Sequence, residues 1–521
     1  MIYNNKKVLI ANRGEIACRI IKSCRKLQIK TVAIYSQVET DAMHVSMADE
    51  AIQINSKAPV SSYLNKYLII KTAKDTNCDA IIPGYGFLSE DPDFAELCIK
   101  EGLIFIGPSS NVMKKFALKN TARAIAKKNE VPIVLGSEIL ESVEVAIKKA
   151  IEIGYPVLLK CAGGGGGIGM KICKNSKELK ESFLTTKKTG KGYFNNDNVY
   201  LEKYISNPRH IEVQVFGDGN NEVISLGERE CSIQRRFQKV VEETPSIYID
   251  EKLRQNLITA AINLCKSVNY AYAGTVEFLV DGNTKDFYFL EVNTRLQVEH
   301  PVTEEVTGVD IVEWMLKLAF NKNFEIKDYQ HTPQGHAIEV RVYAEDTTRN
   351  FMPSIGTLTQ VKLPEYSWAR FDFGFKTGSE ISNYFDPMIG KIISYGKTRK
   401  QAIRRLQEIL NETSISGIAT NLPYLRRIIA SKDFIDNKIS TEFLNNFSCT
   451  TPVIEVLKPG FNTTIQDYPG RSNYWSIGVP PSGPVDNFAF QIANAIVGNE
   501  NYGLSGLELT LEGPNLRFHE D

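Results

Sequence analysis

The sequence predicts a multidomain protein that combines α/β and α+β regions. Its 521 residues exceed what one hydrophobic core usually organises, so three or four domains are expected. The first hundred residues alternate short apolar strand signals with helical periodicity, which is typical of a parallel α/β unit. A strand-rich stretch from Asn198 to Glu304 follows, and a turn-rich β segment comes last.

The composition excludes several classes of protein. Apolar residues make up 43% and charged residues 23%, as in ordinary globular proteins. Lys plus Arg and Asp plus Glu both number 61, so no net charge favours nucleic acid or a membrane as partner. Nine cysteines without a CxxC pair indicate free thiols in a reducing compartment. With no membrane-length apolar run and no visible leader, we expect a cytoplasmic protein.

Changes of pattern along the chain set four expected domains. In the first, strand signals such as KVLIAN and DAIIPGYG each run into a turn, and ligands gather at the carboxyl ends of such strands. The second contains a glycine run and the strand-rich stretch, with a lid over about 132–203. The expected limits of the four domains are 1–112, 113–330, 331–448 and 449–521.

A run of five glycines, Gly163 to Gly167, lies between the strand signals YPVLLK and GMKI. Glycines let backbone N–H groups close over phosphate oxygens. The run lacks the Gly-Lys-Ser/Thr ending of a P-loop, and no helix follows it as in a Rossmann motif. A flexible hairpin tip is the alternative, but Lys160 ends the preceding strand, where its ammonium could reach the same phosphates.

The stretch GTVEFLVDGNTKDFYFLEVN predicts an antiparallel hairpin around a DGN turn. If the hairpin centres near Thr284, Glu277 and Glu291 lie directly opposite each other, with Cβ atoms roughly 5 Å apart. Two carboxylates placed in this way repel unless a cation lies between them. Oxygen-only ligands suit Mg²⁺, which nucleotide sites hold with one or two carboxylates.

Every second residue after Glu291 is polar: Asn293, Arg295, Gln297 and Glu299. If the chain stays extended, these side chains share one face. A solvent-facing edge strand is the alternative. The mixture of Arg, Asn and Gln is unusual for a merely soluble face and favours a metal–nucleotide site.

Six motifs in order resemble those of the biotin-dependent carboxylases: ANRGEIA, PGYGFLSE, GGGGGIGM, ERECSIQRR, QKVVEE and EVNTRLQVEHPVTE. The resemblance covers about residues 5–447. It implies an ATP-grasp fold with a Rossmann-like α/β domain before it and a biotin carboxylase C-terminal domain after it. It also implies ATP, Mg²⁺ (or Mn²⁺), bicarbonate and biotin as ligands, and members commonly form homodimers through this portion.

The resemblance assigns roles to matching positions. Arg341 would stabilise the enolate of biotin, and Glu299 would be the general base. Bicarbonate would be bound by Lys239, Arg295, Gln297 and Val298. The metal ligands would be Glu277, Glu291 and Asn293. The nucleotide would contact Lys119, Lys160, Gly166, Gly167, Glu202, Lys203, His210 and Gln234.

Some of these residues have plainer explanations outside their motifs. Lys119 and Lys203 would pass for surface lysines, and His210 for a structural histidine. Cys231 lies inside ERECSIQRR, but no matching base is evident and the family uses no covalent cysteine, so we reject it as a nucleophile. Phe237 stands where relatives usually have His, which removes one polar nucleotide contact.

The last segment contains GFNTTIQDYPGRSNYW and LELTLEGP and predicts a β-rich start with one helix around Asp486 to Val497. It resembles the opening of the urea carboxylase carboxyltransferase domain, which is related to allophanate hydrolase subunit 2 and KipA-type proteins. No Met-Lys-Met biotinylation site is present. The expected partners are therefore a biotinyl carrier domain and the remaining carboxyltransferase region.

The sequence thus predicts an ATP- and bicarbonate-dependent carboxylation of biotin, the first half-reaction of a urea carboxylase. Alternatives are guanidine as the final acceptor, another biotin-dependent carboxylase subunit, and a non-catalytic truncated binding module. The presence of Lys239, Arg295 and Arg341 beside every expected carboxylate argues against the last. The motifs TRLQVEH and QKVVEE disfavour an ATP-grasp ligase of another pathway.

Overall fold

Two compact units make up the chain, Met1–Ser448 and Cys449–Asp521, and each is described by itself. The computed structural model describes residues 3–518 except 4, 57, 163–168, 195, 322–323, 328, 330–332, 446, 448–453, 472–474 and 500–501.

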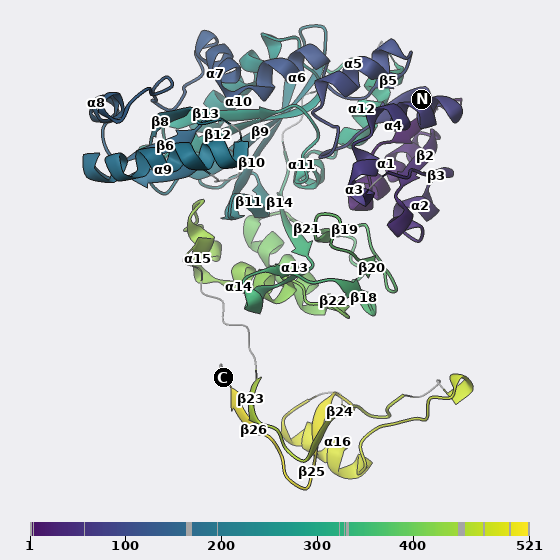
Figure 1. The fold of residues 1–521 in the computed structure, drawn as a ribbon. Coiled ribbons are helices and arrows are strands. Elements are labelled where there is room, and N and C mark those ends of the chain that lie inside the picture. The colour runs from purple at the N-terminus through teal and green to yellow at the C-terminus, as the bar shows by residue number, and fades with distance from the viewer. Residues whose placement is uncertain are drawn as a thin grey trace. The chain divides into compact units, whose positions relative to one another are not determined.

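The first unit opens with a five-stranded parallel sheet in the order β3-β2-β1-β4-β5, which confirms the predicted α/β unit (Figure 1). The strand β1 is apolar on both sides because helices cover both faces. Val8 packs with Ile20 of α1, whereas Leu9 packs with Ile69 of α4 and Phe94 of α5. The elements are β1 (Lys7–Ile10), α1 (Gly14–Lys26), β2 (Lys30–Tyr35), η1 (Gln37–Glu39), α2 (Met43–Met47), β3 (Glu50–Gln53), α3 (Pro59–Tyr63), α4 (Lys66–Asp75), β4 (Ala80–Ile82), α5 (Pro92–Lys100) and β5 (Ile104–Phe105).

An eight-stranded antiparallel sheet in the order β13-β12-β9-β10-β11-β14-β21-β19 forms the centre of the unit. Because β11 pairs with β14, one sheet joins strands from both sides of residue 330. The helix α10 covers it with an apolar face that includes Leu257 and Leu264. The strands are β9 (Arg209–Asp218), β10 (Val223–Arg235), β11 (Gln238–Thr244), β12 (Ala271–Val280), β13 (Phe287–Asn293), β14 (His336–Tyr343), β19 (Ala369–Phe373) and β21 (Met388–Gly396). The helices around them are α6 (Ser110–Ala117), α7 (Lys119–Lys128), α10 (Glu251–Lys266), α11 (His300–Thr307) and α12 (Ile311–Phe320).

A small three-stranded sheet in the order β7-β6-β8 has its own core, in which Leu159 and Leu201 pack against Ala150 and Phe183. The strands β6 and β7 are those predicted on either side of the glycine run. Gly166 and Gly167 themselves lie outside the described residues. This lid consists of α8 (Val143–Ile153), β6 (Val157–Cys161), β7 (Met170–Cys173), α9 (Ser176–Phe194) and β8 (Val199–Lys203), which Figure 1 shows together at the left.

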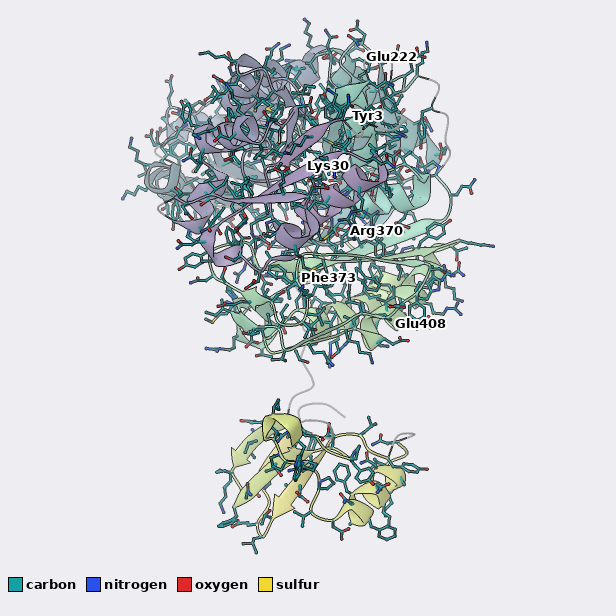
Figure 2. The ribbon with its side chains drawn as sticks, turned by 90° about the vertical axis from the view of Figure 1, so that its right-hand side faces the viewer. Tyr3, Lys30, Glu222, Arg370, Phe373 and Glu408 are labelled. Atoms are coloured by element: carbon teal, nitrogen blue, oxygen red, sulfur yellow. The ribbon has the colours of Figure 1, made fainter. Side chains whose placement is uncertain are left out.

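The rest of the first unit packs on the far end of the large sheet. Helix α13 lies against β21 and buries Leu406 and Leu410 completely. Figure 2 labels Arg370 and Phe373 on the edge strand β19. The remaining elements are β15 (Glu345–Asp346), η2 (Thr347–Arg349), β16 (Met352–Pro353), β17 (Gly356–Thr357), β18 (Gln360–Lys362), β20 (Glu380–Ile381), α13 (Arg399–Glu412), β22 (Ser414–Ser416), α14 (Leu422–Ala430), α15 (Lys432–Ile435) and η3 (Phe443–Asn445).

The described part of the second unit has two separate strand pairs and one α-helix, which begins one residue after the predicted start. Among its described residues only Pro484 and Asn494 are buried, so this part has no apolar core of its own. Phe461, Ile465 and Phe488 are each more than 70% exposed. The elements are β23 (Ile454–Lys458), β24 (Asn462–Gln466), η4 (Trp475–Ile477), α16 (Asn487–Ile496), β25 (Gly506–Thr510) and β26 (Asn515–Phe518).

Across the described part of the chain, no helix combines the length and the apolar character needed to span a membrane.

Glu243 ties β11 to β14 and α13 through a buried carboxylate. It accepts hydrogen bonds from His336 Nε2 at 2.7 Å and from Arg399 Nε at 2.6 Å. Burial alone would raise the pKa of Glu243, but His336 and Arg399 lower it to about 2. A carboxyl group whose pKa falls on folding stabilises the protein above its unfolded pKa and loses that contribution as the pH falls.

We therefore expect Glu243→Gln to lower the free energy of unfolding by about 3 kcal/mol at pH 7. The difference from the wild type should shrink between about pH 4.5 and pH 2, the two pKa values for the unfolded and folded states. Urea unfolding at several pH values measures this difference in the free energy of unfolding. The control Glu96→Gln, at an exposed pair on α5, should change stability by less than about 0.5 kcal/mol. A loss for Glu243→Gln that stays constant down to pH 3 contradicts the assignment.

Candidate active site

The carboxylate hairpin has the predicted register. Glu277 of β12 lies directly opposite Glu291 of β13; the side chain of Glu277 is buried and that of Glu291 is half-buried. Burial and the neighbouring charge of Glu277 raise the pKa of Glu291. Two opposed carboxylates with oxygen ligands only fit a hard divalent cation, whose charge would relieve this repulsion.

The predicted extended strand beyond the hairpin is wrong. Strand β13 ends at Asn293, and residues 294–299 form an irregular loop before α11 begins at His300. Contacts outside the strand bend the chain here: Thr294 N–H donates to Glu90 at 3.0 Å, and His300 Nδ1 lies 2.7 Å from the Gln297 carbonyl. The alternate residues therefore do not share a strand face.

The loop nevertheless brings the polar side chains together around Glu277. The amides of Asn293 and Gln297 donate to Glu277 Oε1 at 2.7 and 3.0 Å. Arg295 in turn donates to the oxygens of those two amides, at 3.2 Å for Asn293 and 2.7 Å for Gln297. Its Nε also donates to Glu90 at 2.9 Å. The polar side chains thus form a hydrogen-bonded cluster around Glu277 instead of one face of an extended strand.

Lys239 lies at the centre of the acidic residues. Its Nζ is 2.5 Å from Glu212, 2.9 Å from Glu277 and 2.6 Å from Glu299. Burial alone would lower the pKa of Lys239, but these three carboxylates outweigh burial and raise it well above its usual value. The ammonium is therefore charged, and it offsets part of the negative charge that surrounds it.

Glu299 is fully buried between two cations. Its Oε1 contacts Lys239, and its Oε2 lies 3.0 Å from Arg341 Nη2. Burial would raise the pKa of Glu299, but Lys239 and Arg341 lower it well below the usual range. The carboxylate is therefore ionised. Arg341 also contacts Glu242, with Nη2 2.5 Å from Oε1.

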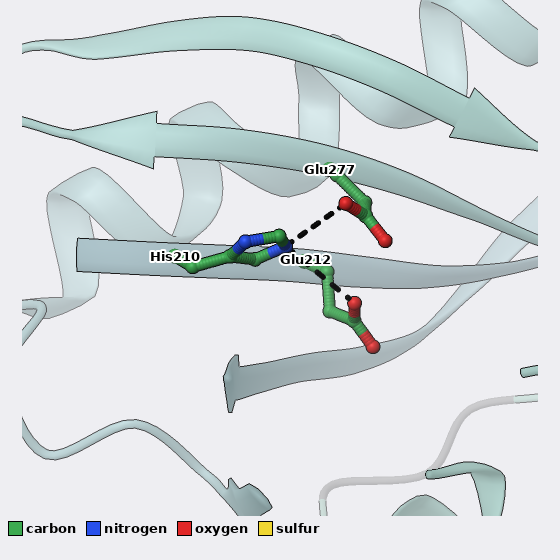
Figure 3. Close-up of side chains that lie close together, drawn as sticks. All are labelled: His210, Glu212 and Glu277. Atoms are coloured by element: carbon green, nitrogen blue, oxygen red, sulfur yellow. Dashed lines mark ion pairs between the residues drawn. The ribbon is translucent and has the colours of Figure 1, made fainter. Parts of the chain in front are cut away.

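His210 lies beside the metal candidates, as Figure 3 shows. Its Nε2 is 3.0 Å from Glu277 Oε2 and 3.9 Å from Glu212 Oε2. Its Nδ1 is 2.9 Å from the amide nitrogen of Gln234, which can only donate. These three side chains are close enough to hold one metal ion.

The lid contributes a second charged group. Glu202 of β8 is held by Lys160 Nζ at 2.7 Å and by Arg123 Nη1 at 2.8 Å. Burial and the charge of Lys160 lower the pKa of Lys119. The charges of Glu291 on the hairpin and Glu202 on the lid act in the opposite direction. Lys119 therefore lies between the lid and the hairpin. The Lys203 ammonium instead donates to the Gly154 carbonyl at 2.8 Å, apart from this group.

A cavity of about 660 Å³ lies beside the lid. It lies where the lid meets the segment after Ser440. Its walls are Pro156, Ile172, Lys174, Tyr204, Ser206, Glu442 and Asn445.

The structure adds residues that the sequence reasoning missed. Glu212 was detectable, because polar His210, Glu212 and Gln214 alternate with buried apolar residues in HIEVQV. Glu90 lies in the motif PGYGFLSE. Arg229 and Glu242 lie in the motifs ERECSIQRR and QKVVEE, although nothing in those motifs indicated their partners on other elements. Arg123 lies outside the six motifs and gave no local signal.

The structure agrees with the rejection of Cys231 as a nucleophile. Burial and the charge of Glu212 raise the pKa of Cys231 well above that of a free thiol, which opposes a nucleophilic role. Phe237 is 63% exposed on the turn between β10 and β11.

Comparison with protein families matches four consecutive stretches of the chain. Residues 4–113 match "Biotin carboxylase, N-terminal domain" and residues 339–446 match "Biotin carboxylase C-terminal domain". Between them, residues 119–327 match "Carbamoyl-phosphate synthase L chain, ATP binding domain". Residues 477–521 match "Carboxyltransferase domain, subdomain A and B".

Individual relatives agree with this division. Urea amidolyase of Saccharomyces cerevisiae is 48% identical over 98% of this chain, but the chain spans only 28% of that protein. Biotin carboxylase 1 of Bacillus subtilis is 46% identical over 85% of this chain and 98% of its own length. The solved biotin carboxylase domain of Hydrogenobacter thermophilus 2-oxoglutarate carboxylase is 44% identical, with a TM-score of 0.79. The match covers 84% of this chain and 97% of the solved chain. That solved structure is described as a dimer in complex with MgADP, ADP and bicarbonate.

Glu212 provides a test of the buried charge cluster. Arg229 is fully buried and donates to Glu212 Oε1 at 2.5 Å, while Lys239 contacts Oε2. Removing the carboxylate leaves a buried guanidinium without its charged partner. We expect Glu212→Gln to lower the free energy of unfolding by about 3 kcal/mol, measured by urea unfolding.

The control is Glu222→Gln, at the surface residue labelled in Figure 2, whose carboxylate lies 3.9 Å from the Lys266 ammonium. It should change stability by less than about 1 kcal/mol. Equal losses in both variants would show that the cluster adds nothing to stability.

Proposed function

This chain belongs to the biotin carboxylase family, a family of ATP-dependent ligases, and from that membership we propose that it carboxylates biotin with ATP and bicarbonate. One observation carries the proposal. A buried base, Glu299, lies between two cations, the partly buried Lys239 and the buried Arg341, next to the carboxylate hairpin. Such a group can bind a small anion and remove its proton beside bound phosphates.

Bicarbonate activation would use the charges of the central cluster. Lys239 and Arg295 attract the anion and orient it, and the ionised Glu299 accepts its proton. The deprotonated oxygen then attacks the γ-phosphorus of ATP as ADP leaves, which forms carboxyphosphate. Phosphoryl transfer of this kind depends mainly on positive charge around the phosphates, which Lys119 and Lys160 supply.

Arg341 would act in the second step. Carboxyphosphate would break down to CO₂ and phosphate, and the phosphate would accept the proton of biotin's ureido nitrogen. Negative charge develops on the ureido oxygen as that proton leaves, and the nitrogen then attacks CO₂. A fixed guanidinium beside that oxygen stabilises the charge. Arg341 is held for this task between Glu242 and Glu299.

The metal is proposed to be Mg²⁺, or Mn²⁺, held by Glu277, Glu291 and Asn293. When bound, the cation would neutralise phosphate charge. The opposed carboxylates support this assignment because their oxygens are the ligands that hard cations prefer. The amide oxygen of Asn293 accepts a hydrogen bond from Arg295 in this structure. It would turn toward the ion when the metal binds.

The complete reaction is proposed from the relatives. Similarity to urea amidolyase over 98% of this chain supports urea as the acceptor, with urea-1-carboxylate as product in urea degradation. Guanidine is the alternative acceptor. Biotin would come from a biotinyl carrier domain, and the carboxyl group would pass to the remaining carboxyltransferase region.

The oligomeric state and the cellular compartment of the protein are proposed as well. The solved 2-oxoglutarate carboxylase domain is described as a dimer, which supports a homodimer here. The eight cysteines in the described part of the chain are buried and unpaired. That supports a reducing compartment, for which we propose the cytoplasm.

The proposed function is tested by bicarbonate-dependent ADP release from the purified chain, with and without free biotin. We expect biotin to stimulate release, and Arg341→Ala to reduce the stimulated rate by about 10²-fold because the enolate loses its counter-charge. Arg404→Ala, at an exposed residue of α13, is the control and should keep the wild-type rate. Measurable ATP binding without any hydrolysis would favour the non-catalytic binding module instead.

The metal assignment has a separate test. We expect Glu291→Gln to raise the Mg²⁺ concentration for half-maximal ATP hydrolysis by about tenfold, since one charged ligand is lost. Binding of Mn²⁺, followed by electron paramagnetic resonance, should weaken in parallel. The control Asp286→Asn changes an exposed carboxylate at the turn of the same hairpin. If it weakens Mn²⁺ binding as much as Glu291→Gln does, Glu291 is not a ligand.

A further inference from the structure

Lys391 of β21 is a fully buried cation that the proposed chemistry does not use. Its Nζ donates to the Val298 carbonyl at 2.8 Å and lies 3.2 Å from Glu15 Oε1. Glu15, on α1, also accepts a hydrogen bond from Tyr85. Burying an ammonium is costly unless its partners compensate. Here one partner is a backbone carbonyl of the candidate bicarbonate loop.

Holding the Val298 carbonyl constrains the next residue. A peptide unit is planar, so fixing the oxygen of Val298 also fixes the N–H of Glu299 and the direction in which its Cα departs. The loop of residues 294–299 has no strand partner that would do this. The hydrogen bond from Lys391 therefore sets where the Glu299 carboxylate lies between Lys239 and Arg341.

Sheet register places Lys391 next to Arg341. On β14 and β21 the two residues are direct cross-strand partners, and Asp372 of β19 is the partner on the other side. Directly opposed residues of an antiparallel pair project from the same face of the sheet. Lys391 thus joins the position of the loop to the position of the arginine.

A second connection runs through the helix that follows the loop. Arg370, labelled in Figure 2, donates to Asp372 at 2.8 Å and to Glu304 of α11 at 2.8 Å. Helix α11, which directly follows the loop, is therefore fastened near its middle to the same edge of the sheet as Lys391.

We propose that Lys391 is a positioning residue for bicarbonate activation, acting through the Val298–Glu299 peptide. This inference rests on the proposed function. The competing explanation is that Lys391 only joins the sheet to α1 through Glu15. The two explanations differ in what happens when Glu15 is neutralised, since the bond from Lys391 to Val298 then remains.

The test compares Lys391→Met, Glu15→Gln and Lys22→Met in the full chain. Methionine keeps much of the length of lysine and removes its charge. Lys22 is the matched control, because its half-exposed ammonium lies 4.0 Å from Asp372 and its loss also removes a positive charge there. Two quantities are measured: the KM values for bicarbonate and ATP, and hydrogen–deuterium exchange of the peptide that spans 294–300.

We expect Lys391→Met to raise the KM for bicarbonate at least tenfold, to leave the KM for ATP within twofold, and to speed exchange in the loop. Glu15→Gln and Lys22→Met should leave these quantities within twofold of the wild type. Unchanged loop exchange in Lys391→Met, or the same KM pattern in Glu15→Gln, overturns the proposal.

If Lys391→Met does not fold, Lys391→Arg takes its place, because it keeps the charge and moves the donor. We expect a higher bicarbonate KM and faster loop exchange, and wild-type values for both overturn the proposal. Absence of bicarbonate-dependent hydrolysis in the wild type would contradict the proposed function, whereas the exchange measurement would still decide whether Lys391 holds the loop.

Discussion

The site depends on keeping several charges close together out of water. Lys239 contacts three carboxylates, and two of them meet further cations, Arg229 at Glu212 and Arg341 at Glu299. Each charge is tolerated because an opposite one lies within hydrogen-bonding distance. Such a cluster has little freedom to rearrange, so the surrounding sheet must deliver every member to its place.

The eight-stranded sheet makes that delivery possible. One sheet supplies four members of the cluster: Glu212 on β9, Lys239 on β11, Glu277 on β12 and Arg341 on β14. These residues are separated by up to 129 positions in the sequence. The fifth member, Glu299, comes from a loop. Its position depends on contacts from other elements, which include Glu90, His300 and Lys391. The least regular segment of the site is thus the one most dependent on tertiary contacts.

The described part of the second unit differs from the first in how little apolar surface it buries. Its described strands pair only two by two, and large apolar side chains such as Phe461 and Phe488 remain exposed. Two-stranded pairs without a covering layer bury little apolar surface. The first unit, by contrast, encloses several apolar cores, so its site can be rigid whatever the second unit does.

The sequence by itself determined the parallel unit, the lid strands and the opposed pair Glu277 and Glu291, because turn residues and local periodicity fix strand register. It erred beyond Asn293, since alternation cannot reveal that Glu90 and His300 bend the chain. Only the tertiary structure decided that Glu212, Arg229 and Lys391 surround the site. Their partners are remote in sequence, and a buried charge is recognisable only once its opposite is in place.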